Sequence, residues 1–173
     1  PLFDGKGRPT MLVAVSRDIT DLRANRISLT RINECLLAFG TDSFENIGRL
    51  TALCGELLDA DSAVYKRVEK GYLTVVGGWN LPAGLKPAAP MEGTPCGEAI
   101  KRADDELFIA KEPTQTYIGR TVRSGDRIIG ALSVLFRRDV AAHSVFTKVM
   151  GILASAIAVD LGTFGALDIS VKG

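Results

Sequence analysis

Residues 127–136, RIIGALSVLF, are the feature that most limits what this chain can fold into. In a strand, successive side chains point to opposite faces of the sheet. Here both alternating sets are apolar: one holds Ile128, Leu132, Val134 and Phe136, and the other holds Ile129, Ala131 and Leu135. A strand of this kind is central in its sheet and is covered on both faces. We therefore predict a long hairpin over 117–139 that turns at Ser124-Gly125-Asp126 and whose second strand is buried on both sides.

Helical periodicity predicts the elements that cover this sheet. Residues 144–161 form an amphipathic helix, and its broad apolar stripe holds Val145, Phe146, Val149, Met150, Leu153, Ala156 and Ile157. Ile152 and Val159 lie outside that stripe, so we expect the helix to be buried twice, once on the sheet and once on another helix. A second helix starts at an N-cap, Asp42 or Ser43, and carries a stripe of Phe44, Ile47, Leu50, Cys54 and Leu57.

The middle of the chain predicts shorter elements. Strands over 62–69 and 72–80 are joined by a tight turn at Lys70-Gly71. Residues 81–95 hold four of the seven prolines, which predicts a long loop without secondary structure of its own. A short helix over 95–104, with Pro95 in its first turn, and a short strand over 107–110 follow.

Heptad spacing distinguishes the helix expected over 18–39, which begins at the N-cap residue Asp18. Leucines recur seven residues apart, at Leu22, Leu29 and Leu36. The intervening series is Asn25, Ile32 and Phe39, of which only Asn25 is polar. This spacing is typical of a coiled-coil seam with one polar core residue that sets the register. An amphipathic helix docked on its own domain explains the same residues equally well, and both interpretations stay open.

Charge and cysteine usage exclude several classes of protein. The formal net charge is +1, which provides no basic field for a nucleic acid. Three widely spaced cysteines (Cys35, Cys54, Cys96) and a single histidine favour neither a zinc site nor a disulfide framework. We expect a reducing, cytoplasmic location. The most apolar segment, 149–159, is too short to span a bilayer, so we expect no membrane contact.

Two segments resemble known signalling domains. YIGRTVRSGDRIIGALSVLF (117–136) and GTPCGEAI (93–100) are similar to the signature hairpin and pocket helix of GAF domains, and the resemblance covers about 35–162. FDGKGRPTMLVAVSRDITDLR (3–23) resembles the last strands of a PAS domain, which end in Asp-Ile-Thr.

The resemblance implies an α+β fold with a central antiparallel sheet of five or six strands. The N- and C-terminal helices would cover one face, and the long loop and short helix would cover the other. It also implies four parts of the chain: a PAS remnant (1–17), a connecting signalling helix (18–39), a GAF domain (40–162) and a tail (163–173) for which the sequence predicts no structure.

The function implied is that of a sensor in a longer bacterial signalling protein. Such a domain binds a small ligand or a neighbouring domain and signals through its helices, as a parallel homodimer, to an output such as a histidine kinase or a diguanylate cyclase. The ligand-binding candidates are Tyr65, Trp79, Cys96, Ile100, Phe108, Tyr117 and Leu132. A ligand-free dimerisation module is the alternative, because the same side chains could simply pack a core.

The sequence lacks the residues by which known GAF domains bind their cofactors. The Asn-Lys-x-Asp-Glu motif of cyclic-nucleotide-binding relatives is absent, and Cys96 precedes glycine rather than the histidine usual in bilin-binding relatives. A haem would need an axial ligand, and the only histidine, His143, precedes the last helix. Haem, bilin and cyclic nucleotide are therefore disfavoured, and the cofactor is unknown.

An enzyme interpretation rests on Cys96-Gly97. This pair resembles the nucleophile region of free methionine sulfoxide reductases, which also use a GAF fold. That chemistry needs a resolving cysteine on the preceding strands or loop, and there is no cysteine between Cys54 and Cys96. We therefore expect this chain not to be an enzyme.

Overall fold

The computed structural model describes residues 2–3, 9–11, 20–102 and 106–170, and the side chains of 26–102 and 106–162. Two short strands, β1 (Leu2–Phe3) and β2 (Pro9–Met11), pair antiparallel near the start of the chain. The rest of the strand predicted before residue 17, and the predicted N-cap Asp18, lie outside the described residues. The connecting helix is α1 (Thr20–Leu37), and α2 (Ser43–Leu57) follows it.

A six-stranded antiparallel sheet forms the centre of the domain, in the order β5-β4-β3-β8-β7-β6. Its strands are β3 (Ser62–Glu69), β4 (Tyr72–Trp79), β5 (Ala88–Pro90), β6 (Phe108–Glu112), β7 (Gln115–Ser124) and β8 (Arg127–Phe136). β8 lies between β3 and β7, which confirms that the strand apolar on both faces is central. The turn residues Lys70, Gly71 and Gly125 have positive φ, as the predicted tight turns require.

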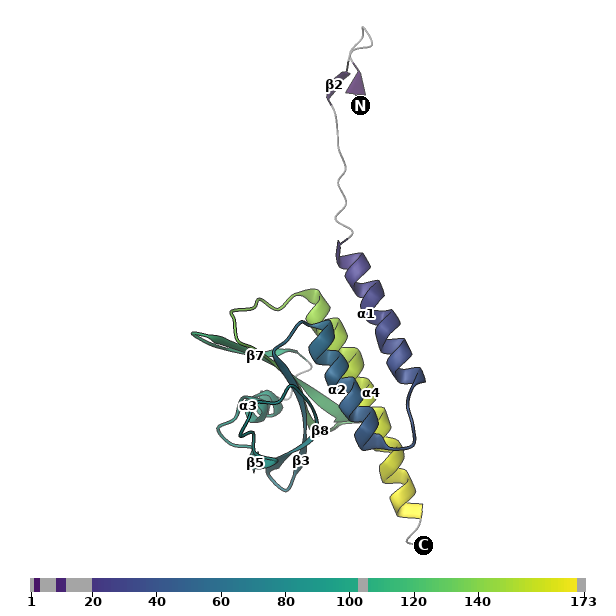
Figure 1. Cartoon of the computed structure of the whole chain (residues 1–173), viewed down its shortest axis with the longest axis vertical. Helices are drawn as coiled ribbons and strands as arrows, with labels where there is room; N and C mark the ends of the chain where they lie inside the picture. The colour runs from purple at the N-terminus through teal and green to yellow at the C-terminus, as the bar shows by residue number, and fades with distance from the viewer. Residues whose placement is uncertain (1, 4–8, 12–19, 103–105, 171–173) are drawn as a thin grey trace.

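Helices cover the two faces of the sheet unequally (Figure 1). α2 and α4 (Ser144–Ser170) pack on one face, and α1 packs on these two helices rather than on the sheet. The short helix α3 (Pro95–Arg102) covers the opposite face. The predicted α+β architecture, with terminal helices on one side and a short helix on the other, is confirmed.

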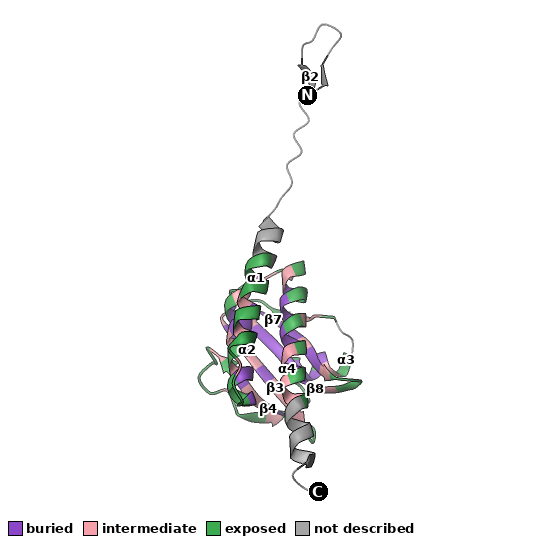
Figure 2. Ribbon diagram, turned by 90° about the vertical axis from the view of Figure 1, so that its right-hand side faces the viewer, coloured by how far each residue is buried: buried purple, intermediate pink, exposed green. Residues whose placement is uncertain are grey.

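The helix-side core lies between the sheet and α2 and α4 (Figure 2). Its fully buried large side chains are Ile47, Leu50, Tyr65, Ile118, Val122, Leu132, Val134, Phe136, Met150, Leu153 and Ile157. Asp42 caps α2, since its Oδ1 accepts from the backbone N–H of Phe44 at 2.8 Å and of Glu45 at 3.3 Å. Phe44, which was expected in the buried stripe, is 56% exposed at the first turn of the helix.

Two predicted boundaries are wrong. Residues 88–90 of the expected loop form β5, which pairs with the start of β4 at the sheet edge, where proline is tolerated because no further strand needs its N–H. α4 does not end near 161 but runs on to Ser170, through most of the predicted tail. Glycine inside a helix costs only about 1 kcal/mol, so Gly162 does not end it.

α4 is also the one described helix that is long and apolar enough, over Ser144–Gly162, to cross a membrane by length and composition. This segment is longer than the 149–159 run considered in the sequence. The structure buries 33% of this stretch, including Val149, Met150, Leu153 and Ile157, which pack in the helix-side core.

The heptad residues of α1 divide into two groups. Ile32 is 3% exposed in the helix-side core, as the docked-helix interpretation predicts. Leu29 is 54% exposed and Leu36 is 37% exposed, so packing within the chain does not cover the whole seam. The side chains of Leu22 and Asn25 lie outside the described residues.

Candidate functional site

The α3 side of the sheet brings together four of the seven predicted ligand-binding residues. Cys96 and Ile100 come from α3, Phe108 from β6 and Tyr117 from β7. We call the packed group around them the α3-side cluster; its members are Val68, Leu73, Met91, Cys96, Ile100, Tyr117 and Ala131. Phe108 adjoins it, because its ring meets Tyr117 edge-on with the centroids 6.1 Å apart.

A hydrogen-bonded group of three polar side chains lies in this cluster. The Tyr117 hydroxyl donates to Cys96 Sγ at 3.0 Å and lies 2.6 Å from Ser133 Oγ, which is itself 3.5 Å from Cys96 Sγ. Cys96 is 2% exposed and Ser133 is 1% exposed. Burial, reinforced by the neighbouring Cys96, raises the pKa of Tyr117 well above its ordinary value. The phenol is therefore a neutral donor over the physiological range, and the group is a set of polar tips in apolar surroundings.

Three predicted site residues lie on the other side of the sheet. Tyr65 and Leu132 face each other across β3 and β8 and both belong to the helix-side core. Trp79 packs on α2 at Gly55, where an added Cβ would collide with the indole ring. The prediction that these three line a pocket under α3 is wrong, because residues directly opposite in a sheet share a face and this face meets α2 and α4.

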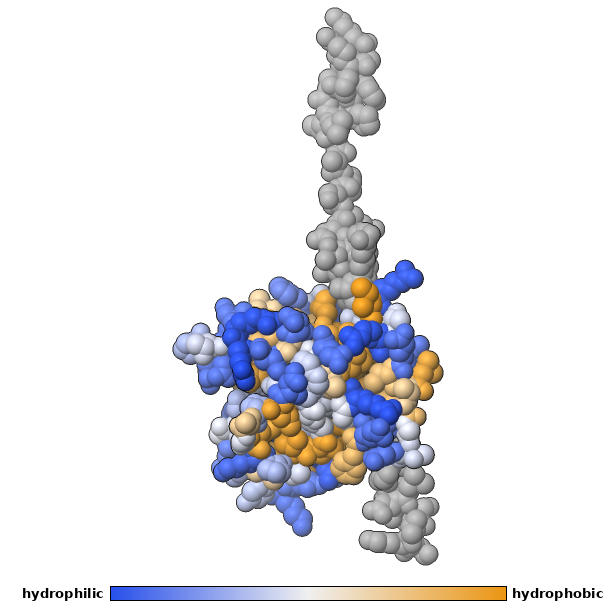
Figure 3. All heavy atoms as spheres, viewed as in Figure 1, coloured by the Kyte–Doolittle hydropathy of each residue, from blue (hydrophilic) through white to orange (hydrophobic). Residues whose placement is uncertain are grey.

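A cavity of about 410 Å³ opens at the end of β8, and none of the seven predicted ligand-binding residues lines it. Leu135 pairs with Tyr117 and so lies on the α3 side; the other lining residues are Pro82, Thr114, Gln115 and Arg137. Apolar side chains also gather on the surface beside α3 (Figure 3). An apolar wall with a few polar groups is typical of small-molecule sites. Only the parity of residues along β8 could have indicated Leu135.

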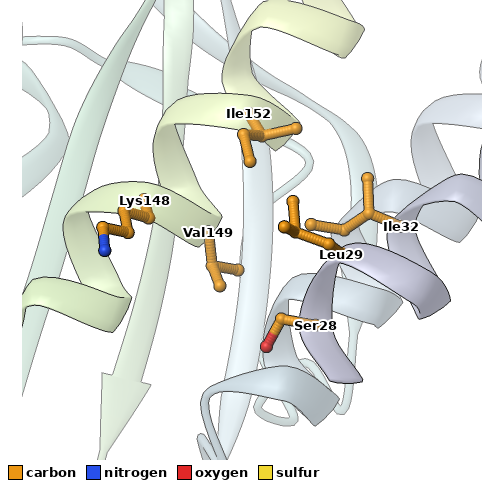
Figure 4. Close-up of a pocket in the computed structure, with 6 residues that line it drawn as sticks. All are labelled: Ser28, Leu29, Ile32, Lys148, Val149 and Ile152. Carbon is orange, nitrogen blue, oxygen red and sulfur yellow. The ribbon is translucent and has the colours of Figure 1, made fainter. Parts of the chain in front are cut away.

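A second hollow lies between α1 and α4, on the far side of the helix layer. Its volume is about 340 Å³, and its lining is mostly apolar: Ser28, Leu29, Ile32, Lys148, Val149 and Ile152. Figure 4 shows Leu29 and Ile32 from α1 facing Val149 and Ile152 from α4. An adjacent hollow farther along the same two helices includes Leu36, Ile152 and Val159. These two hollows make the helix layer a second candidate site.

The three cysteines are unpaired and lie in different places. Cys54 is in the helix-side core and Cys96 in the α3-side cluster, so the sheet separates them. Cys35 is half-buried on α1. No group of three or more His, Cys, Asp or Glu side chains suited to a metal lies within the part of the chain that the structure describes.

Thiol labelling at pH 8 is expected to modify Cys35 first and to spare Cys54 and Cys96 until the domain unfolds.

Burial raises the pKa of Cys54 to about 12, whereas an unfolded thiol titrates near 8.5. The neutral thiol therefore contributes fully to stability below about pH 8.5, and that contribution is lost as the pH rises towards 12. Urea unfolding should show a steady loss of stability above pH 9, and a smaller loss in Cys54→Ala. Equal pH slopes for the two proteins would contradict this assignment.

Solved structures with the same fold were found at low sequence identity. The GAF domain of a phosphoenolpyruvate-protein phosphotransferase from Coxiella burnetii superposes with a TM-score of 0.68 at 13% identity, over 89% of this chain and 99% of that chain. The second GAF domain of DevS from Mycobacterium smegmatis gives 0.62 at 16%, over 75% and 99%. Free methionine-R-sulfoxide reductase from Neisseria meningitidis, in complex with its substrate, gives 0.61 at 16%, over 87% and 94%.

These likenesses show that the chain has the GAF fold, as the resemblance of residues 93–100 and 117–136 implied. No family model and no curated protein matches the sequence. GAF domains are typical of signalling and sensor proteins, while the reductase shows that the fold also supports catalysis.

Proposed function

We propose that this chain is a sensory GAF domain that binds a small ligand, or a neighbouring domain, on its α3 side and transmits the change through α1 and α4. The observation that supports this most directly is the double role of β8. Ser133 contacts the α3-side cluster, while its neighbours Leu132 and Val134 pack in the helix-side core. Because protein interiors are close-packed and transmit strain, a shift of β8 caused by a ligand near α3 reaches α4.

The α3 side also has the composition that a small-molecule site needs. The α3-side cluster supplies apolar walls, and the hydroxyls of Tyr117 and Ser133 supply polar tips. The cavity at the end of β8 adds Gln115 and Arg137. A neutral or singly negative organic molecule of modest size suits this set of side chains.

Native mass spectrometry of the purified chain tests the proposal first, because it reports any co-purified small molecule. Hydrogen exchange then tests transmission, with a panel of nucleotides, amino acids and carboxylic acids as probes. A compound that slows exchange in α3 should also slow exchange in α4, because β8 joins the two layers. Protection confined to α3 would contradict the relay.

The alternative is a structural module whose only task is dimerisation. The buried α3-side cluster favours it, since neighbouring side chains already cover Cys96 and Ala131, which are 2% and 0% exposed. A chain that binds nothing in the panel and co-purifies with nothing would support this alternative.

A reductase is the remote alternative, and its support is the likeness to two free methionine-R-sulfoxide reductases. Against it, Cys96 is buried, and the sheet separates Cys54 from it. With free methionine-R-sulfoxide and dithiothreitol, we expect no turnover above that of a Cys96→Ser variant. Turnover that depends on Cys96 would replace the sensory proposal.

We further propose that the domain belongs to a longer cytoplasmic protein, with a PAS domain before it and an output such as a histidine kinase or a diguanylate cyclase after it. This rests on the resemblance of residues 3–23 to the end of a PAS domain.

A further inference from the structure

Arg120 is the charged exception in a row of buried residues on β7. Its neighbours on the same face of the strand, Ile118 and Val122, are both 0% exposed in the helix-side core. Arg120 pairs directly with Leu132 of β8, which also belongs to that core, so the register turns the Arg120 side chain towards the helices. A half-buried guanidinium gives up part of its hydration, and a charge in that setting calls for a partner.

The Arg120 guanidinium has little to bind within the described part of the chain. It lies over Gly151 of α4, where its Cζ is 3.5 Å, and each of its two Nη atoms 3.6 Å, from the position of an added Cβ. Its single hydrogen bond, from Nη1 to the Thr147 carbonyl, is 3.4 Å long, beyond the usual range of about 2.7–3.2 Å. No carboxylate of the described residues forms an ion pair with Arg120. Most donors of this guanidinium are therefore available to a ligand.

A hollow of about 220 Å³ lies beside Arg120, between β7 and α4. We call it the β7–α4 hollow, and its lining residues are Arg120, Thr121, Arg123, Gly151, Ala154 and Ser155. β6 pairs with β7 only as far as Gly119, so the hollow lies beyond the point where β6 stops covering the edge of β7. Its lining holds two arginines and no carboxylate, against small residues of α4. The hollow is therefore a positively charged recess, separate from the α3 side and from the apolar hollows between α1 and α4.

We infer that the β7–α4 hollow binds the phosphate group of a small soluble compound. A planar guanidinium presents parallel N–H donors that match two oxygens of a phosphate. Arg120 is the principal ligand, because Arg123 Nη1 already donates to the Asp126 carbonyl at 3.4 Å. Arg123 supplies the second positive charge, so a doubly charged phosphate suits the hollow better than a carboxylate does. The Ser155 hydroxyl, which donates to the Gly151 carbonyl at 3.0 Å, adds a polar group on the α4 side.

A phosphate in this hollow would contact both β7 and α4 and would hold the helix against the strand. The binding follows from the arginines and the hollow alone, whereas its consequence for signalling rests on the proposed function. In that function α4 transmits the change that begins on the α3 side. The phosphate would then act on the transmitting helix directly, as a second input that does not pass through the α3-side cluster.

Isothermal titration calorimetry of the whole chain with inorganic phosphate, at constant ionic strength, tests the binding. We expect a saturable heat and a dissociation constant of roughly 1 mM or below, since two charge-assisted hydrogen bonds supply about that affinity. Sulfate should compete with phosphate, and acetate should not, because it carries one charge. The absence of a saturable heat, or equal binding of acetate, would overturn the inference.

Three variants locate the site. Arg120→Gln should weaken phosphate binding at least tenfold, because it removes the guanidinium that lies over α4. Ser155→Leu should do the same with both arginines in place, because the larger side chain fills the hollow. Arg127→Gln is the matched control: it removes the same charge from an exposed position on the same hairpin, outside the hollow, and should change binding less than twofold. Equal effects of Arg120→Gln and Arg127→Gln would overturn the assigned site, and thermal melts confirm that each variant is folded.

Hydrogen exchange separates the site from its consequence. Phosphate should slow exchange in α4 around Gly151, and Ser155→Leu should abolish that effect. Saturable binding with unchanged exchange in α4 would overturn the second input but not the site, and neither result bears on whether a ligand binds near α3.

Two further probes distinguish the sources of the phosphate group. Glycerol 3-phosphate should bind, whereas vesicles that contain phosphatidic acid should not, because the hollow lies between a strand and a helix. Binding to the vesicles alone would overturn the assignment to a soluble compound.

Discussion

Gly97→Ala is expected to lower the free energy of unfolding by about 3 kcal/mol, at the upper end of the range for overpacked sites. A Cβ at Gly97 would collide with the backbone carbonyl of Met91, which has no side-chain freedom to move aside. The same short connection is tied down by Thr94, whose hydroxyl donates to the Met91 carbonyl at 2.9 Å and accepts from the Gly97 N–H at 3.1 Å. The first turn of α3 therefore has to move away from Met91.

Urea unfolding followed by the fluorescence of Trp79, the single tryptophan, measures this loss. Labelling of Cys96 measures the displacement of α3 directly and should become faster in the variant. Gly48→Ala is the matched control, since nothing lies within 4 Å of a Cβ built there in α2. This control should raise stability by up to about 1 kcal/mol, because alanine is the better helix former. An equal effect of the two substitutions would refute the steric argument.

Asn46→Ala is expected to cost about 2 kcal/mol and to loosen the turn between α1 and α2 from α4. Asn46 is 2% exposed, and its side-chain amide both accepts from the Gly40 N–H and donates to the Gly40 carbonyl, each at 3.0 Å. The same amide nitrogen donates to Asp160 Oδ1 at 3.1 Å. The substitution leaves the Gly40 N–H, the Gly40 carbonyl and Asp160 Oδ1 without this partner. A buried polar group that loses its partner costs roughly 1–3 kcal/mol, and water offsets part of that cost where it reaches the group.

Urea unfolding again gives the magnitude, and hydrogen exchange gives the location. Amides of the α1–α2 turn and of α4 near Asp160 should exchange faster in Asn46→Ala. Asp42→Ala removes only the cap of the same helix, so it should cost about 1 kcal/mol and leave α4 unchanged. If both variants raised the exchange rate of α4 equally, the hydrogen bond from Asn46 to Asp160 would not be what holds the α1–α2 turn to α4.

Local patterns were enough to predict most elements of this fold. The hairpin over β7 and β8, the turn at Lys70-Gly71 and the cap of α2 all follow from neighbours in the sequence. The same holds for the four site residues that do converge. Cys96 and Ile100 share one short helix, and Phe108 and Tyr117 sit on adjacent strands joined by a tight turn.

Two of the three residues predicted on the wrong side of the sheet, Tyr65 and Leu132, share one physical cause. β8 is apolar on both faces, so its sequence carries no signal of which face meets α3. The size and apolar character of Tyr65 and Leu132 suit a pocket wall, but the register between β3 and β8 turns both towards α2 and α4. Leu135 was overlooked for the same reason.

Spacing along the chain by itself determined most of the strands and helices, β5 and the end of α4 excepted, because backbone sterics and side-chain periodicity act over a few residues. It also determined that α1 carries heptads. Only the tertiary structure decided that Ile32 would be covered within the chain while Leu29 and Leu36 would not, and which face of β8 would meet α3. Those outcomes depend on pairing between distant segments, and a shift of one residue in that pairing reverses every side chain of a strand.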